Sequence, residues 1–478
     1  MNLKLVAHTL GRVVSLEGIC MVLSLVCSFL VGDGQHIPFL ISIAICFAVG
    51  IPLSYIKPKE KRLFSRDGFA TVALSWISLS IFGAIPFIVS GVIPNFIDAF
   101  FETASGFTTT GASILKDVEV VPKSILFWRS FTHWIGGMGV IVFLVAILPL
   151  SGGSNMHLMK AESTGPSVGK LVPKVKSTAK ILYTIYFGIT VTLLVLLLCG
   201  GMNLFEALCT TFGTVGTGGF GFKNSSMAEY STYIQVVVTV FMMLCGINFS
   251  VYYLILIRKF SLAFRSTEMW TYLGIIAVSV IVITFNCMPL FDGFAVALKH
   301  SAFQVGSIIT TTGYTTSDYN LWPELSKAIL VMLMFIGACA GSTGGGIKVC
   351  RILMLVKSIV KEIKIASHPK STHKVILDGR TVEHETVRNV NVFMVSYLVI
   401  FAFSVLIISI DNFDFTTNFT AVTATINNIG PGLAGVGPTS NFSGYSNLST
   451  LVLAFDMLIG RLEIFPLLVL FSPQAWKK

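Results

Sequence analysis

The sequence predicts an all-α membrane protein in which four similar but non-identical units surround one central pore, preceded by two further transmembrane helices. Composition, a series of apolar segments and a fourfold repeated turn support this fold class. Of the 478 residues, 54% are hydrophobic and 12% are charged, and the mean hydropathy is +0.81. Because soluble domains carry about a quarter charged residues, most of this chain is expected to lie in lipid.

Apolar segments that can cross a bilayer recur along the whole chain. A membrane-spanning helix needs about 20 residues, and roughly ten spans are expected. The first is interpreted as an anchor rather than a removable signal, because it has no small-residue cleavage site and a second span follows almost at once. The expected spans are residues 16–31, 37–55, 69–92, 126–150, 181–199, 234–257, 272–288, 328–340, 392–410 and 451–471.

Basic and acidic residues alternate between successive loops. The positive-inside rule therefore predicts that both termini and the basic loops face the cytoplasm. The formal charge of +10 is explained by this topology and by anionic lipid, and no nucleic-acid partner is expected. The basic loops hold Lys57, Lys59, Lys61, Arg62 and Arg66, then Lys160, Lys170, Lys174 and Lys176, then Arg258, Lys259 and Arg265, and finally residues 357–388. The acidic loops hold Asp98, Glu102, Asp117, Glu119, Asp292, Asp318 and Asp414.

Cysteine and histidine show no metal-binding pattern. The nine cysteines form no CxxC pair, and we expect them to pack as small apolar residues. His36 and His133 are expected near membrane boundaries, and no HExxH motif is present. A catalytic metal is therefore not expected.

A turn rich in threonine and glycine recurs in four span-loop-span units. Residues 108–112 read TTTGA and residues 310–314 read TTTGY. The segments before them, 101–106 and 303–308, align without a gap. One such turn would mean little, because small residues also pack membrane helices against each other. Two near-identical copies at matching positions predict a repeat.

The other two copies are degenerate. Residues 216–220 read GTGGF, and the upstream alignment places Gly219 opposite Gly111, although a one-residue slip to Gly218 is also compatible. Residues 427–431 read NNIGP, so Gly430 is retained while the threonines are replaced. The fourth copy depends on its position and on the preceding segment 419–426.

These turns predict a pore for a cation. Non-helical backbone at membrane depth is tolerated only where it is buried in protein or lines a water-filled cavity. Glycine lets successive carbonyl oxygens turn the same way, and a ring of such oxygens can replace the hydration shell of a cation. The short segments before the turns would act as half-helices whose negative ends point toward the ion.

At these residues the chain resembles the superfamily of potassium transporters that contains the bacterial Trk and Ktr membrane subunits and the plant HKT proteins. The resemblance covers nearly the whole chain, and the two extra N-terminal spans favour the TrkH type. It implies four pseudo-symmetric M1-P-M2 units and gated uptake of K⁺, with no nucleotide bound by this chain itself. The expected organisation is 1–60 for the N-terminal pair and 61–155, 156–262, 263–365 and 366–478 for the four units.

The resemblance also implies which residues select the ion. Glycine in all four turns is similar to the potassium-selective members, whereas serine in the first loop marks sodium-preferring HKT proteins. Asn427–Ile429 differ from the threonines of the first and third turns, so the way in which the fourth loop coordinates the ion is left open. The implied K⁺ filter consists of Thr109, Thr110, Gly111, Gly218, Gly219, Thr311, Thr312, Gly313, Asn428, Ile429 and Gly430.

A glycine-rich segment interrupts the span after the third turn. A glycine costs roughly 1 kcal/mol relative to alanine inside a helix, so a continuous helix is not expected there. In the family a corresponding break forms an intramembrane gate beneath the filter, and a flexible hinge without a gating role is the alternative. The expected gate residues are Gly341, Ser342, Thr343, Gly344, Gly345 and Gly346.

Arg461 lies among apolar residues of the last span, where an arginine costs about 3 kcal/mol or more unless it meets a partner or water. It is similar to a pore-facing arginine of the family that repels cations until the gate rearranges. A salt bridge to Glu463 or Asp456, or snorkelling to the interface, is the alternative. Lys348 and Arg351 could serve the gate or could be ordinary cytoplasmic basic residues.

Two nucleotide-like motifs lack their structural context. Residues 216–221 match GxGxxG, but their neighbours are apolar spans rather than a soluble βαβ unit. Residues 341–348 are similar to a phosphate loop, but Ile347 separates the last glycine from Lys348, and no serine or threonine follows the lysine. Regulation must then come from a partner. The resemblance implies a homodimer in the cytoplasmic (inner) membrane, docked on a cytosolic ring of nucleotide-binding RCK domains of the TrkA type.

Two other functions were weighed against a pore. A secondary transporter coupled to Na⁺ or H⁺ also uses broken helices, but the units here repeat in parallel order and no chain of buried carboxylates is evident. An intramembrane enzyme would need a nucleophile with a base or a pair of aspartates. Asp456 and Glu463 are the only acids expected well inside spans, and neither has an evident partner.

Overall fold

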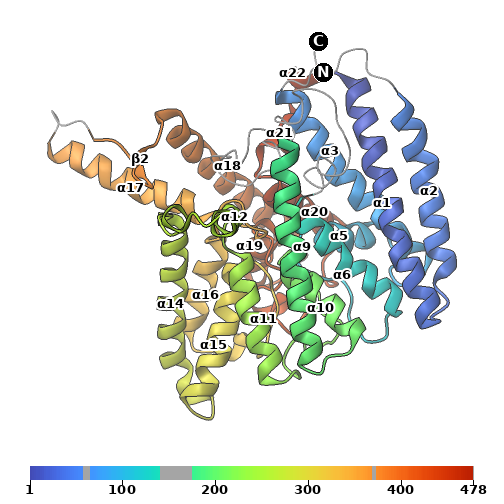
Figure 1. The fold of residues 1–478 in the computed structure, drawn as a ribbon, viewed down its shortest axis with the longest axis horizontal. Helices are drawn as coiled ribbons and strands as arrows, with labels where there is room; N and C mark the ends of the chain where they lie inside the picture. Colours follow the sequence, from blue (N-terminus) through green and yellow to red (C-terminus); the bar gives the residue numbers. More distant parts are fainter. Residues whose placement is uncertain (57–64, 140–174, 369–372, 477–478) are drawn as a thin grey trace.

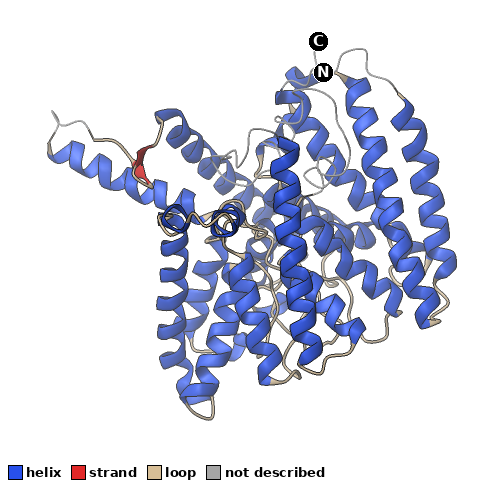
Figure 2. Ribbon diagram, viewed as in Figure 1, coloured by secondary structure: helices blue, strands red, loops and turns tan. Residues whose placement is uncertain are grey.

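The computed structural model describes residues 1–56, 65–139, 175–368 and 373–476 (Figure 1). The chain is almost entirely helical, and the strands drawn in Figure 2 belong to one short hairpin, β1 (Ile376–Leu377) and β2 (Arg380–Thr381). The predicted all-α class is thus confirmed. Lys57 to Arg62, and Lys160, Lys170 and Lys174 of the predicted basic loops, lie outside the described residues.

The first two helices, α1 (Leu3–Val31) and α2 (His36–Tyr55), form a hairpin that packs on the rest of the molecule through α3 and α6. Their backbones meet at Gly11 and Gly50, where a Cβ on Gly50 would lie 2.9 Å from the carbonyl oxygen of Gly11. Small residues permit this close approach between membrane helices. The helix α1 ends at Gly32, whose left-handed backbone directs its N–H to the carbonyl of Ser28.

Four units follow, each with a long first helix, a short second helix and a third helix. The first helices are α3 (Ser65–Gly83), α9 (Val175–Cys199), α14 (Thr267–Cys287) and α18 (His384–Ile408). The short helices are α5 (Phe96–Phe107), α10 (Leu204–Gly216), α15 (Phe294–Ile309) and α19 (Phe415–Ile426). The third helices are α6 (Lys123–Gly137), α11 (Thr232–Cys245), α16 (Glu324–Phe335) and α20 (Asn447–Arg461).

Among the described residues, six helices are long and apolar enough to cross a membrane, and they correspond to six of the expected spans. They include α1, α2, α9, α14 and α18, and the sixth joins α3 to the short α4 (Ile85–Val89). The multi-pass character predicted from composition is therefore confirmed.

The remaining predicted spans belong to the third helices. Two of them, 234–257 and 451–471, contain breaks that were not predicted, whereas the break after α16 was predicted. The helix α11 is followed by α12 (Phe249–Leu256) at an angle of 91°, α16 ends at Phe335, and α20 is separated from α21 (Phe465–Phe471). Positive φ angles at Glu463 and Ile464 break the last of these. For the predicted span 126–150, α6 ends at Gly137 and residues 140–150 lie outside the described part of the chain.

The remaining elements are short, apart from one long helix. The helix α17 (Val349–Ser367) leads into the β-hairpin and then α18, and Figure 1 shows α17 extending away from the bundle. The short elements are α13 (Phe260–Ala263), α22 (Pro473–Trp476), η1 (Met288–Leu290), η2 (Tyr319–Leu321), η3 (Ser409–Asp411) and η4 (Ala434–Val436).

Both termini lie at the same end of the molecule (Figure 1). The N–H of Asn2 donates to Asp67 at the start of α3, at 3.2 Å, and α21 near the C-terminus also packs on α3. The two ends of the described chain thus pack on the same helix.

Candidate functional site

The four short helices end inside the molecule, each at one of the repeated turns. We number these turns loop 1 (108–112), loop 2 (216–220), loop 3 (310–314) and loop 4 (427–431). Three of the helices begin with a side-chain cap, because Asn95, Asn203 and Asp414 accept N–H groups of their first turns. Their C-terminal halves are buried, so the negative ends of four helix dipoles face the interior.

All four loops share one backbone conformation. In loop 1, Thr109 and Gly111 have positive φ angles of 55° and 82°. The same alternation recurs at Thr217 and Gly219, at Thr311 and Gly313, and at Asn428 and Gly430. Since both positions of the pattern match, Gly219 rather than Gly218 is the equivalent of Gly111.

The amide hydrogens of the loops are turned back toward the short helices. The N–H before each loop glycine donates to a carbonyl five residues earlier, at 2.8 to 2.9 Å. The donors are Thr110, Gly218, Thr312 and Ile429, and the acceptors are Ser105, Gly213, Ser307 and Ala424. The peptide groups therefore present their oxygens, not their hydrogens, away from the helices.

The four loops meet in a closed ring. A Cβ on Gly111 would collide with the carbonyl oxygen of Gly218 in loop 2, and one on Gly219 would collide with that of Thr312 in loop 3. One on Gly313 would collide with the carbonyl oxygen of Ile429 in loop 4. One on Gly430 would lie 2.7 Å from the carbonyl oxygen of Thr110, which returns to loop 1. The residues expected to form a filter are thus brought together, and glycine alone fits the contact positions.

Loop 4 keeps this geometry although asparagines replace its threonines. In loops 1 and 3, Thr108 and Thr310 hydroxyls accept or donate a bond with the threonine two residues later, at 2.7 and 2.8 Å. In loop 4, the amide of Asn428 donates to the hydroxyl of Thr110, at 3.0 Å, and to the carbonyl of Met457, at 2.8 Å. Loop 4 is therefore held by a side-chain amide that reaches loop 1 and α20, whereas hydroxyl contacts within the loop hold loops 1 and 3.

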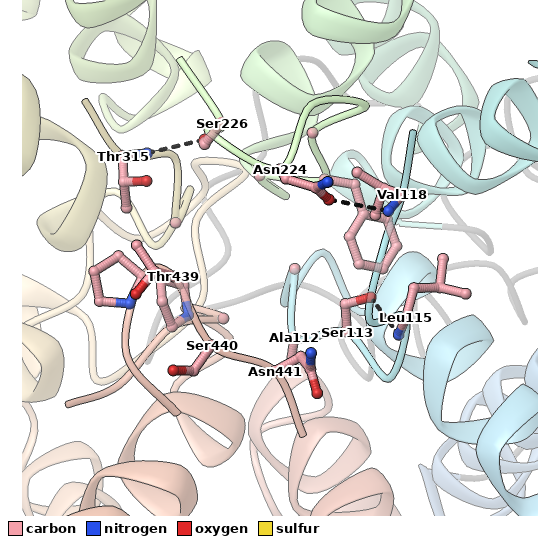
Figure 3. Close-up of a pocket in the computed structure, with 18 of the residues that line it drawn as sticks. Ala112, Ser113, Leu115, Val118, Asn224, Ser226, Thr315, Thr439, Ser440 and Asn441 are labelled. Atoms are coloured by element: carbon pink, nitrogen blue, oxygen red, sulfur yellow. Dashed lines mark hydrogen bonds between the residues drawn. The ribbon is translucent and has the colours of Figure 1, made fainter. Parts of the chain in front are cut away.

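A cavity of about 150 Å³ opens on one side of the ring and is lined by all four units. Figure 3 shows Ala112 and Ser113 next to Asn441, with Asn224 across the opening and Ser226 beside Thr315. Thr315 donates its N–H to Ser226, at 3.2 Å, and Val118 donates to Asn224, at 3.1 Å. The units are thus tied together around the mouth of the ring.

On the other side, the glycine loop (residues 341–346) lies against the ring. Gly337 donates to the carbonyl of Ile347, at 2.7 Å, which closes the base of the loop. The N–H of Gly345 donates to the hydroxyl of Thr311, at 2.7 Å. The loop therefore contacts loop 3 directly, as a gate beneath a filter would.

Arg461 joins the glycine loop to α6. Its guanidinium donates to the carbonyl of Thr343, at 2.8 Å, and to those of Gly136 and Gly137, at 2.6 and 2.9 Å. The side chain is only 7% exposed, so it does not snorkel to an interface.

The two acids considered as partners of Arg461 have contacts of their own. Asp456 accepts a bond from Ser404, at 2.7 Å. Glu463 forms an ion pair with Arg351, whose guanidinium also lies 4.1 Å from the centre of the Phe393 ring. Arg351 is thus buried and paired rather than a free basic residue at the surface.

Lys348 is a buried cation under the ring. Its side chain is 1% exposed, and its ammonium donates to the carbonyls of Gly344 and Gly345, the latter at 3.1 Å. With Arg461 it places two positive charges beside the glycine loop. Positive charges at such a place repel a nearby cation.

Several buried charged and titratable residues were missed or misplaced by the sequence analysis. Glu102, expected in an acidic loop, lies buried in α5, where it pairs with Arg129 of α6 at 2.6 Å. His133, expected at a boundary, is fully buried in α6. Glu17 is a further acid inside a span, buried in α1. The available signal was an isolated charge within an apolar run, at Glu17 and at Glu102.

The sequence matches the TrkH family model, described as cation transport protein, over residues 35–478. It is 36% identical over 488 residues to the Trk system potassium uptake protein TrkH of Escherichia coli K12, and 34% identical over 487 residues to TrkG of the same strain. These alignments cover 100% of this chain and 100% and 99% of the relatives. The crystal structure of the potassium transporter TrkH from Vibrio parahaemolyticus superimposes with a TM-score of 0.89 and 31% identity, covering 100% of both chains. The chain therefore belongs to the TrkH family of cation transport proteins.

Proposed function

We propose that this chain takes up potassium through a single gated pore across the cytoplasmic (inner) membrane, with loops 1 to 4 as its selectivity filter. The observation that carries the proposal is the closed ring, in which each loop glycine abuts a carbonyl of the next loop. The relatives TrkH and TrkG, which are potassium uptake proteins, support the choice of ion. In this proposal K⁺ is the transported ion. The chain itself carries out no covalent chemistry and binds no nucleotide.

The filter works by replacing water around the ion. The carbonyl oxygens of Thr110, Gly218, Thr312 and Ile429 occupy equivalent positions in the four loops. Such a ring supplies the oxygens that a K⁺ ion loses when it leaves its hydration shell. The four helix ends behind the loops add a negative potential.

The glycine loop serves as the gate in this proposal. Its bond from Gly345 to Thr311 holds it under the filter, and Arg461 and Lys348 hold its carbonyls. Conduction requires the loop and the two cations to move away from the axis. The structure is accordingly interpreted as a closed state.

The proposed units are 1–60, 61–155, 156–262, 263–365 and 366–478, with both termini and the basic segments in the cytoplasm. A homodimer and a cytosolic TrkA-type RCK partner are part of the proposal. Described basic residues on that side include Arg258, Lys259, Arg265, Lys357 and Lys361. Affinity purification of the full-length chain, followed by mass measurement of the native complex, distinguishes a dimer with a bound partner from a lone protomer.

Substitution of one filter glycine tests the proposal. Gly313→Ser should lower the preference for K⁺ over Na⁺, because the added side chain collides with the carbonyl of Ile429. The measurement is competition by Na⁺ against K⁺ uptake in a bacterial strain that lacks its own K⁺ uptake systems. Gly274→Ser is the matched control, since a Cβ there meets nothing within 4 Å. An unchanged preference in the Gly313 variant would contradict the filter assignment.

A further inference from the structure

The helix α6 presents Arg129 and His133, one turn apart, to the boundary between loops 1 and 2. Arg129 pairs with Glu102 of α5, with 2.6 Å between Nε and Oε1, and the two side chains are 3% and 0% exposed. Within the described ranges, it is the one ion pair in which both partners are buried to this degree. A buried pair of this kind needs further hydrogen bonds to its free atoms.

Those further bonds reach the backbone segments that directly follow Gly111 in loop 1 and Gly219 in loop 2. On the side of loop 1, the Glu102 carboxylate accepts the N–H of Ile114, at 2.9 Å, and the hydroxyl of Ser113, at 3.0 Å. On the side of loop 2, Arg129 donates to the carbonyl of Gly221, at 2.9 Å. Its guanidinium also lies 3.4 Å from the centre of the Phe220 ring. The ion pair therefore connects the backbone after Gly111 with the backbone after Gly219.

His133 forms a second connection, one turn deeper. Its Nδ1 lies 2.7 Å from the carbonyl oxygen of Gly106 in α5, and its Nε2 accepts the N–H of Phe220, at 3.2 Å. These partners assign a neutral ring with its proton on Nδ1. Gly218 packs so closely on the imidazole that a Cβ there would collide with the ring. His133 thus holds loop 2 against the end of the first short helix.

Among the described residues, the fourth unit does not repeat this pair of connections, and no other short helix has an acid at the position of Glu102. Gly136 in α6 and Gly460 in α20 abut the carbonyls of Phe107 and Ile426, which occupy equivalent positions before their loop glycines. This correspondence aligns Arg129 and His133 with apolar residues of α20, Leu453 and Met457. The equivalents of Glu102 in the other short helices are Thr210, Gln304 and Ala421.

Loop 2 has the greatest need of external support. It contains glycine at 216, 218 and 219 and is followed by another at 221. Glycine leaves the backbone with more conformational freedom than any other residue. Few side chains of its own can then fix the positions of its carbonyls, and the contacts from α6 supply that constraint.

We propose that Glu102, Arg129 and His133 are positioning residues that hold loop 2 in register with loop 1 and thereby set the preference for K⁺ over Na⁺. This inference rests on the proposed filter. None of the three side chains has to touch the ion. Loosening one quarter of the ring changes the size and stiffness of the oxygen cage, on which discrimination between the two ions depends.

The test uses the full-length chain in cells that lack their own K⁺ uptake, with Na⁺ competition against K⁺ uptake as the readout. Glu102→Gln and Arg129→Met should each lower the preference for K⁺ about tenfold, equivalent to roughly 1.4 kcal/mol. The double variant should be no worse than the poorer single variant, because both changes remove the same pair. Arg129→Lys should recover part of the preference, since it keeps the charge but loses the planar fork.

Two further variants complete the design. His133→Phe keeps an aromatic ring but removes both hydrogen bonds, and it should also lower the preference. Lys327→Gln breaks an exposed pair with Glu324, whose side chains are 22% and 90% exposed, and should leave it unchanged. Uptake is normalised to the amount of protein in the membrane, so that poor folding is not mistaken for lost selectivity.

A wild-type preference in Glu102→Gln, Arg129→Met and His133→Phe would overturn the inference. A lower amount of protein in the membrane with an unchanged preference for K⁺ over Na⁺ would also overturn it. That result would show that the three residues have a purely structural role. Gly313→Ser is measured in parallel. If that variant loses preference while the α6 variants keep it, the filter stands and the positioning role fails. If all of them keep it, the filter proposal itself fails.

Discussion

Arg461 of the fourth unit contacts both the glycine loop and α6. Its guanidinium donates to carbonyls of the glycine loop and of α6, and hydrogen bonds to charged groups contribute about 1.5 kcal/mol or more each. The side chain thus stabilises the loop under the ring and also places a positive charge there.

Replacing Arg461 with methionine should raise K⁺ flux. Loss of even one such bond would shift the equilibrium between closed and open states by roughly tenfold. Tracer flux into vesicles reconstituted with the purified chain measures the effect. Arg388→Met serves as a control, since Arg388 is exposed near the start of α18. Equal or lower flux in the Arg461 variant, at equal protein, would argue against its role in closure.

At the residue scale, the sequence predicted the loop glycines well and the surrounding contacts poorly. The repeated turns pointed to Gly111, Gly313 and Gly430. In the structure, a positive φ angle and a nearby carbonyl oxygen both require glycine at these positions. Arg129 and His133 could not be assigned, because their partners lie up to 92 positions away along the chain. Their roles depend on how α6 packs beside α5, and no local pattern reports that.

The glycine loop is the element that lies against the ring on the side away from the cavity. It is fixed by bonds at several points, including Phe249 to Gly341, at 3.0 Å, and Gly345 to Thr311, at 2.7 Å. At its flanks, Glu268 accepts the N–H groups of Ala340 and Cys350, at 2.7 and 3.1 Å. The flanks are thus anchored independently of the glycines.

Deletion of residues 341–346 should therefore raise ion flux without unfolding the surrounding helices. The obstruction and its contacts with Arg461 are removed, whereas the anchors at Glu268 remain. The comparison is tracer flux through the deletion and the intact chain in matched vesicles, together with the Na⁺ competition ratio. A decrease in flux, with protein of normal stability, would show that the segment supports conduction rather than closing it.

Element boundaries reveal what hydropathy can and cannot predict. The break after α16 was expected from its run of glycines, and the first helices of the units matched their apolar segments. The breaks at 246–248 and 462–464 were not expected, because the segments on both sides are apolar and each break holds only one polar residue, Asn248 or Glu463. Hydropathy reports that a segment lies in lipid or protein, but not the direction of its axis.

At the scale of the whole molecule, the N-terminal hairpin stands apart from the ring. The helices α1 and α2 pack mainly on each other and reach the first unit through α3 and α6. The ring itself is built from residues after position 100. The hairpin should therefore support stability rather than ion selection.

Gly50→Val tests this division. The new side chain would meet the backbone of Gly11 and Ser15 within 3 Å, and overpacking of this kind costs about 1–3 kcal/mol. The thermal midpoint of the purified protein should fall by a few degrees while Na⁺ competition stays at the wild-type level. Gly188→Val, at an open position of α9, should change neither quantity. Altered ion preference in the Gly50 variant would place the hairpin within the selective machinery.

The ring comes from one polypeptide rather than from four copies of a shorter one. A mutation in the gene therefore alters a single quadrant, whereas in a homotetramer the same mutation would appear four times over. This freedom accounts for the asparagines of loop 4 and for the ion pair confined to the boundary of loops 1 and 2. Each quadrant can be tuned in small evolutionary steps that a fourfold symmetric channel cannot take.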